Sequence, residues 1–239
     1  MTASTKKPLI SLRNVKKSYT SGEVTTEILH GINLEIFEGE ITVILGASGS
    51  GKTTLLNIIG GIDRPSSGNC LFKENDLNKF TDKQLTNYRR ENIGFVFQFY
   101  NLVPTLTAIE NVQVSTELAT NPMSPLEAIK IVSLEDRKNN FPSQLSGGQQ
   151  QKVSIARAIA KNPSLILCDE PTGALDLETG RMVLKILYNL NHEHKRTIVI
   201  ITHSNAVACM AHRVIHIGSG IITKNEENQN ILRPEEISY

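Results

Sequence analysis

Several features are scarce in this chain of 239 residues, and each absence excludes a class of protein. The three cysteines, Cys70, Cys168 and Cys209, are odd in number and lack the spacing of a metal site, which indicates free thiols in a reducing compartment. Lysine and arginine together number 25 against 24 acidic residues. Bulk charge therefore gives no reason to expect nucleic acid or an acidic membrane surface as the main partner.

Long apolar segments are also missing. The first nine residues contain no hydrophobic stretch, so we expect no signal peptide. No run approaches the ~20 apolar residues that a membrane-spanning helix needs. We therefore expect a cytoplasmic chain that forms one domain over residues 1–239, for which any membrane role depends on a partner.

The most informative segment that is present runs from residue 46 to 54. It reads GASGSGKTT and fits the phosphate-binding P-loop pattern G-x-x-x-x-G-K-[ST]. The apolar run Ile41–Leu45 before it predicts a buried strand, and Leu55–Ile59 after it predicts a buried helix, so a chance glycine-rich turn is the weaker interpretation. Glycines let backbone N–H groups approach phosphate oxygens, and the helix N-terminus adds partial positive charge. We expect the nucleotide to contact Gly46, Ala47, Ser48, Gly49, Ser50, Gly51, Lys52, Thr53 and Thr54.

Within this loop two side chains have distinct expected roles. The Lys52 ammonium is expected to act on the β- and γ-phosphates, and the Thr53 hydroxyl is expected to bind Mg²⁺.

Two adjacent carboxylates end another apolar run. Leu165–Cys168 predicts a buried strand, and Asp169 and Glu170 follow it directly. Active groups of open α/β sheets gather at the carboxyl ends of the strands. We expect Asp169 to hold Mg²⁺ and Glu170 to orient or deprotonate an attacking water. A strand that ends in solvated acids would explain the pair equally well in isolation, but the P-loop favours the catalytic interpretation.

A second glycine-rich motif, Leu145–Gln149, resembles the signature of the ATP-binding subunits of ABC transporters and argues against a P-loop kinase or GTPase. The resemblance covers about residues 9–224, with the other motifs in the family's order. It implies adenine stacking on Tyr19, a Mg²⁺- and nucleotide-sensing glutamine at Gln98, a D-loop at Ala174–Asp176 and a γ-phosphate switch at His203. Ser204 departs from the family, in which an acid is frequent after the histidine.

The signature also implies a dimer. Its residues precede a predicted helix, Gln149–Lys161, whose N-terminus is suited to binding an anion. In the family two subunits pack head to tail, and each signature covers the ATP on the P-loop of the other. We therefore expect a homodimer in which the nucleotide also contacts Ser146, Gly147, Gly148 and Gln149.

The resemblance implies an α/β P-loop NTPase fold with a parallel core sheet, an N-terminal antiparallel β subdomain and a helical subdomain inserted at about residues 100–160. Polar residues from Lys224 to Asn230 predict a solvated connector inside a C-terminal tail, 224–239, and Pro234–Ile237 predicts a short helix. The remaining strands and the next helix are expected at Ile10–Tyr19, Ile28–Phe37, Ile93–Phe97, Thr197–Ile201 and Leu177–Leu190.

In their detailed residue sequence, the motifs resemble those of the ATPases of MacB-, LolD-, FtsE- and bacitracin-export-type systems. This resemblance implies an ATP- and Mg²⁺-dependent ATPase that powers a separate integral-membrane permease from the inner face of the membrane, in export or mechanotransmission. The short helical segment Ser115–Leu134 favours antimicrobial-peptide or drug export or resistance. The alternatives are a soluble ABC ATPase without a permease and a lipoprotein-release or cell-division ATPase.

The loop after Gln98 favours the permease-linked function, because this region of family members contacts the coupling helix of the permease. Phe99, Tyr100 and Leu102 are therefore expected to form the contact, with a packed aromatic loop as the alternative.

Overall fold

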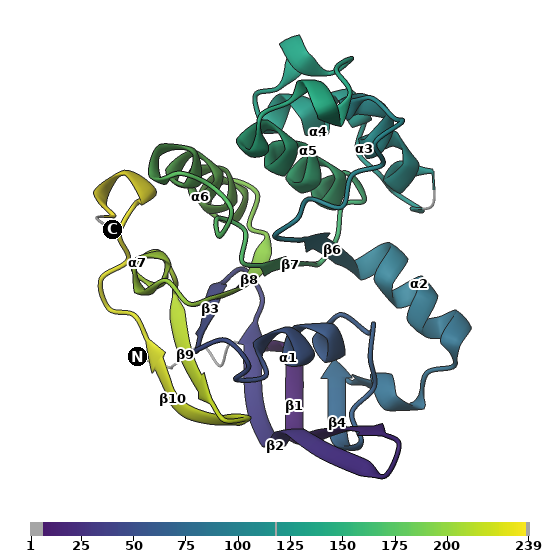
Figure 1. The fold of residues 1–239 in the computed structure, drawn as a ribbon, viewed down its shortest axis with the longest axis vertical. Coiled ribbons are helices and arrows are strands. Elements are labelled where there is room, and N and C mark those ends of the chain that lie inside the picture. The colour runs from purple at the N-terminus through teal and green to yellow at the C-terminus, as the bar shows by residue number, and fades with distance from the viewer. Residues whose placement is uncertain (1–6, 118, 238–239) are drawn as a thin grey trace.

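The computed structural model describes residues 7–117 and 119–237 (Figure 1). Its strands are β1 (Pro8–Ser21), β2 (Val24–Phe37), β3 (Ile41–Leu45), β4 (Ser67–Phe72), β5 (Asn75–Asp76), β6 (Ile93–Val96), β7 (Leu165–Asp169), β8 (Thr197–Thr202), β9 (Arg213–Gly218) and β10 (Ile221–Glu227). Its α-helices are α1 (Lys52–Ile59), α2 (Asp82–Asn92), α3 (Ala108–Thr116), α4 (Pro125–Ile131), α5 (Gly147–Ala160), α6 (Leu177–His192) and α7 (Asn205–Ala208). Short 3₁₀ turns lie at Leu77–Lys79, Glu135–Arg137, Pro142–Gln144 and Pro234–Glu236.

The central sheet has the strand order β10-β9-β3-β8-β7-β6, and its pairs are parallel except for β9 with β10. Every residue of β3 and β8 is buried. Parallel strands read as continuous apolar runs because helices or a second sheet cover both of their faces. The strand ends are in register, since Leu45 lies opposite Thr202 and Val96 lies opposite Cys168.

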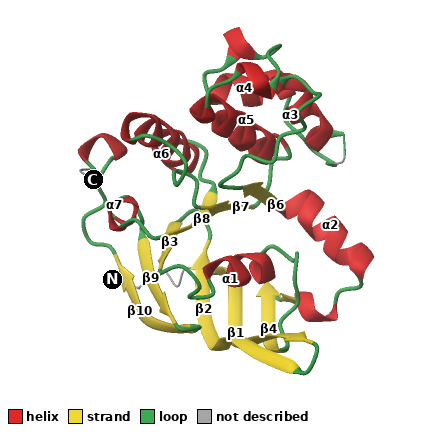
Figure 2. Cartoon of the chain, viewed as in Figure 1, coloured by secondary structure: helices red, strands yellow, loops and turns green. Residues whose placement is uncertain are grey.

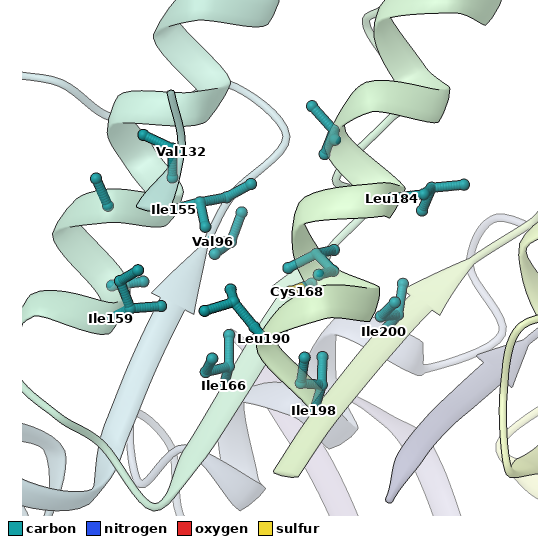
Figure 3. Packing of buried hydrophobic residues seen from close by; sticks show 14 of the residues in the cluster. Val96, Val132, Ile155, Ile159, Ile166, Cys168, Leu184, Leu190, Ile198 and Ile200 are labelled. Carbon is teal, nitrogen blue, oxygen red and sulfur yellow. The ribbon is translucent and has the colours of Figure 1, made fainter. Parts of the chain in front are cut away.

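Alternate residues of each central strand face two different hydrophobic clusters. On one side Ile198 and Ile200 of β8 pack with α3, α4, α5, α6 and α7. Figure 3 shows this cluster, with Ile155 of α5 and Leu184 of α6 above the strands. On the other side Val199 and Ile201 pack with α1, α2 and the second sheet. The period-two alternation of a strand thus places one apolar run in two cores.

The second sheet has the order β2-β1-β4-β5 and is antiparallel throughout. It faces α1 through Leu29, Leu34 and Leu55, among other residues of the second cluster. The helices α3, α4 and α5 gather at one end of the molecule, at the top of Figures 1 and 2. The predicted fold class, with a parallel core sheet and an antiparallel β subdomain, is confirmed.

The expected connector at Lys224–Asn230 is wrong for its first half. Residues up to Glu227 form the outer part of β10, where Asn225 lies opposite Ile215 of β9. Backbone pairing decided this segment, because its side chains are exposed and gave no apolar pattern. The chain then returns to the body of the protein, where Ile237 is buried and Glu235 pairs with Lys185 of α6 at 2.7 Å. No helix within the described residues is long and apolar enough to cross a membrane.

One buried amide organises the loop that leads from the sheet to α3. Asn111 is 1% exposed, and its side chain bonds to both backbone groups of Val103 and to the carbonyls of Leu106 and Thr107. Substitution by alanine leaves these groups without their partner. We expect Asn111→Ala to lower the free energy of unfolding by about 1–3 kcal/mol, measured by urea denaturation. The exposed Asn87→Ala in α2 is the control, and an equal loss in both variants would contradict this role.

Candidate functional site

A cavity of about 770 Å³ opens at the carboxyl edge of the central sheet. Its walls come from the loop after β3, from the ends of β6, β7 and β8, and from one residue of β2. The lining residues are Ile28, Ser48, Gly49, Gly51, Lys52, Thr53, Thr54, Gln98, Asp169, Glu170 and His203. The structure therefore brings both predicted constellations, the P-loop and the carboxylate pair, into one space.

The loop between β3 and α1 needs glycine for two physical reasons. Gly49 and Gly51 have φ values of 78° and 99°, in the left-handed region that side chains disfavour. At Gly46 a Cβ atom would lie 2.4 Å from the carbonyl oxygen of Ile217. The Lys52 ammonium donates to the carbonyls of Gly46 and Ala47 at 2.8 and 3.0 Å, and this brings the cation back over the loop.

Asp169 reaches the P-loop side of the cavity. The Thr53 hydroxyl donates to its carboxylate at 3.3 Å. Burial raises the pKa of Asp169 above its ordinary value, and the charge of Glu170 adds to this effect, while the Thr53 hydrogen bond and the Lys52 charge oppose it. A hydroxyl and a partly buried carboxylate are oxygen ligands of the kind that suits Mg²⁺.

These donors fit a magnesium ion that is completed by phosphate oxygens and water. The described residues contain no group of three or more His, Cys, Asp or Glu side chains that could hold a metal by themselves. Mg²⁺ is commonly bound through one or two protein oxygens together with substrate phosphates. Gln98 lines the same cavity, and an amide oxygen is a further ligand of the kind that suits Mg²⁺.

Glu170 and His203 form a pair in this cavity. The Nδ1 atom of His203 lies 3.0 Å from a carboxylate oxygen of Glu170. The backbone at Glu170 has a φ of 46°, and its N–H donates to the carbonyl of Ile201 at 3.0 Å. A non-glycine residue in the left-handed region is uncommon and often marks a functional position. The adjacent β8 thus fixes both the backbone of Glu170 and the start of the loop that carries His203.

Arg157 of α5 contacts the loop after Gln98. Its guanidinium donates to the carbonyls of Tyr100 and Asn101, whose φ values of 57° and 51° are both left-handed. Arg157 therefore stabilises an unusual backbone next to Gln98. In this loop Phe99 is 75% exposed, whereas Leu102 is half-buried and packs against the first hydrophobic cluster.

Tyr19 lies outside the lining of this cavity. Its hydroxyl donates to Asp63 at 2.7 Å and also interacts with the Thr54 side chain at the start of α1. Burial raises the pKa of the Tyr19 phenol, and the hydrogen bond to Asp63 acts in the same direction. Tyr19 is therefore next to the P-loop helix. Asp63 escaped sequence analysis because it has no motif and follows Tyr19 by 44 residues.

The signature residues also lie outside the cavity, at the start of α5. Ser146 caps this helix, and its backbone N–H donates to the side-chain oxygen of Gln149 at 2.9 Å. Gly147 and Gly148 have no room for a side chain, since an added Cβ would lie 2.8 Å from the Tyr100 hydroxyl and 2.1 Å from Thr179 respectively. One chain thus carries two glycine-rich helix starts, of which the P-loop lines this cavity and the start of α5 does not.

A family model described as ABC transporter matches residues 29–173, which is more than half of the chain. The chain belongs to the ABC transporter family. It is an ATPase domain of the ABC type, as the sequence predicted, and homologues include MacB-type proteins.

Relatives of this ABC domain differ in length. The ATP-binding protein MJ0796 of Methanocaldococcus jannaschii is 46% identical over 228 residues, which are 92% of this chain and 97% of that protein. An ABC transporter ATP-binding protein of Mycoplasma pneumoniae is 47% identical over 97% of this chain, but the match spans only 50% of that protein. The macrolide export ATP-binding/permease protein MacB of Brucella melitensis is 44% identical, and the match covers 95% of this chain and 36% of that protein. The chain therefore spans half or less of these two larger relatives.

Solved structures agree with the fold. A dimeric post-hydrolysis state of MJ0796 bound to ADP and Pi has a TM-score of 0.84 and 44% identity, covering 91% of this chain and 98% of that one. CbiO1 of Clostridium perfringens, part of the ABC transporter complex CbiONQ, has a TM-score of 0.81 at 28% identity, covering 97% and 90%.

The raised pKa of Asp169 predicts an effect on folding stability that can be measured in the absence of nucleotide and Mg²⁺. Because its pKa is raised in the folded chain, stability falls as pH rises from the unfolded value of about 3.9 through the folded value. At pH 7 the folded protein therefore bears the free-energy cost of burying the ionised Asp169 carboxylate. We expect Asp169→Asn to raise the Tm of the nucleotide-free, Mg²⁺-free protein at pH 7, with a smaller gain below about pH 4.

Asp176 provides the matched control for this measurement. It caps α6, and hydrogen bonds from Thr179 lower the pKa of its carboxyl, so Asp176→Asn should lower the Tm at pH 7. A lower Tm for Asp169→Asn at pH 7 would contradict the effect of burial described above.

Proposed function

We propose that this chain binds Mg²⁺ and ATP in the cavity at the carboxyl edge of the sheet and hydrolyses ATP to ADP and phosphate to power a separate membrane permease. The observation that carries the proposal is the meeting of the P-loop, Asp169, Glu170, Gln98 and His203 around one cavity. The whole assembly is then an exporter or a mechanotransmission complex of the MacB type. The chain would lie on the inner face of the membrane through its partner.

Each residue has a physical role in this proposal. The backbone N–H groups of the P-loop and the Lys52 ammonium bind the β- and γ-phosphates. Thr53, Asp169 and Gln98 would hold Mg²⁺, which neutralises phosphate charge when it is bound.

The remaining cavity residues act on the water and the γ-phosphate. Glu170 accepts a proton from the attacking water or orients it, and His203, 3.0 Å away, positions that carboxylate and can donate to the γ-phosphate. Tyr19 supplies an aromatic face for adenine.

We further propose a head-to-tail homodimer. The signature residues Ser146–Gln149 lie outside the lining of the cavity of their own chain, which supports their action on a second subunit. A helix N-terminus presents free N–H groups and partial positive charge, and a phosphate from the partner's nucleotide would satisfy both. The dimeric relative MJ0796 with ADP and Pi is consistent with this arrangement.

The catalytic assignment is tested with Glu170→Gln. This variant keeps the side-chain shape but removes the general base, so we expect ATP binding to persist while hydrolysis falls by roughly 10²–10⁴-fold. It should also accumulate an ATP-bound dimer by size-exclusion light scattering. Lys52→Ala is the matched control and should lose ATP binding in calorimetry. Native turnover in Glu170→Gln would refute the role of Glu170, and a persistent monomer in saturating Mg-ATP would refute the dimer.

A groove beside the loop after Gln98 is the surface that we propose for the permease. Its volume is about 520 Å³, and the rings of Phe95 and Phe97 stack within it at 5.4 Å. Burial lowers the pKa of Lys161 in the wall to about 8. The other lining residues are Thr86, Arg89, Arg90, Asn101, Val114, Ser115, Arg157 and Ala158. An aromatic floor with a cationic rim suits a short amphipathic helix of the permease.

Two exposed apolar side chains test this surface. Phe99 is 75% exposed and Val114, in the groove, is 52% exposed. We expect Phe99→Ala with Val114→Ala to retain ATP binding but to lose co-purification with the permease, since a central contact of this kind is worth about 2 kcal/mol or roughly 30-fold. Val24→Ala, 67% exposed on β2, is the control. Normal permease recovery with the double variant would place the coupling surface elsewhere.

A further inference from the structure

A cluster outside the cavity surrounds the side chain proposed to stack on adenine. The carboxylate of Asp63 accepts three hydrogen bonds. Lys17 Nζ and the Arg64 backbone N–H donate to Oδ1 at 2.6 and 2.7 Å, and the Tyr19 hydroxyl donates to Oδ2 at 2.7 Å. Both carboxylate oxygens are therefore engaged, so the orientation of the carboxylate is fixed by its neighbours.

Lys17 determines which face of the Tyr19 ring is available. Its ammonium lies 4.7 Å from the ring centroid and is anchored by Asp63 and by the Arg64 carbonyl at 2.8 Å. Residues two apart on a strand point to the same side, which brings Lys17 over the ring. The cation occupies one face of the phenol, so a base can stack only on the opposite face.

The cluster is also tied to the helix that carries the P-loop. The backbone N–H groups of Ile62 and Asp63 both donate to the carbonyl of Asn57 in α1, at 2.9 and 3.2 Å. The Tyr19 side chain bonds to Thr54 at the other end of the same helix. Contacts at two points therefore fix the position of the Tyr19 ring relative to α1, the helix that begins with Lys52.

We infer that Asp63 is a positioning residue for nucleotide binding, which holds the Tyr19 ring at a fixed place and angle relative to the P-loop so that adenine stacks when the phosphates are bound. This inference rests on the proposed ATP site. An aromatic side chain that is 45% exposed would otherwise lose rotational freedom on binding. Because the Tyr19 ring is already held in place in the free protein, nucleotide binding does not incur the entropy cost of ordering it.

The experiment compares ATP with inorganic triphosphate, which has no base, by calorimetry on the full chain. We expect Asp63→Asn to weaken ATP about two- to tenfold, the range for ordering one side chain, and to leave triphosphate affinity unchanged. Tyr19→Phe keeps the ring but loses the hydroxyl that Asp63 holds, so it should weaken ATP similarly. The double variant should be no weaker than either single one, because both changes break the same contact.

A nearby carboxylate is the control. Asp82 bonds to Arg64 at 3.0 Å and is fully exposed, so Asp82→Asn should leave ATP affinity unchanged. The inference is overturned if Asp63→Asn binds ATP normally, if it weakens triphosphate by the same factor, or if its effect adds fully to that of Tyr19→Phe. Failure of the ATP site itself is distinguished by Lys52→Ala, because normal binding of both ligands by that variant would refute the P-loop site whatever Asp63 does.

Discussion

Burial of β8 between β3 and β7 is the constraint on which the site depends. With both faces covered, these strands are buried and mostly apolar, and their carboxyl ends lie in register. Their ends bring Gly46, Glu170 and His203 to one edge of the sheet. Polar side chains follow directly where the buried strands end, so the packing of the core also sets the position of the proposed catalytic groups.

Two loops near this edge contain non-glycine residues in the left-handed backbone conformation, which side chains disfavour. Glu170 adopts a left-handed conformation while its N–H pairs with β8, and Tyr100 and Asn101 adopt similar conformations with their carbonyls bound by Arg157. Such strain persists only where surrounding contacts overdetermine it. The loop at Glu170 is bonded to β8, and the loop after Gln98 is bonded to Arg157 of α5. The side chain of Gln151 in α5 also donates to the carbonyl of Pro171, so α5 contacts both loops.

The chain has two glycine-rich helix starts, the P-loop before α1 and the signature residues at the start of α5. Lys52 and the P-loop line the cavity of their own chain, while the start of α5 carries a capping box and lies outside that cavity. A capping box satisfies some of the N–H groups of the first helical turn and leaves others without an intrahelical partner. In the proposed dimer, these N–H groups would bind a phosphate of the nucleotide held by the second subunit.

The sequence by itself determined the P-loop, the carboxylate pair, the apolar strands and the fold class, since each depends on local residue order: a glycine pattern, a run of branched apolar residues, or a cap. It did not determine β10, whose exposed polar residues are held by pairing with β9, or the inward packing of Leu102. Only the tertiary structure decided that Asp63 contacts Tyr19 and that Arg157 holds the loop after Gln98. It also decided that Phe95 of β6 and Phe97, just after that strand, line a groove with basic side chains from α2 and α5. These contacts join residues far apart in the chain, and long-range packing rather than local periodicity sets their geometry.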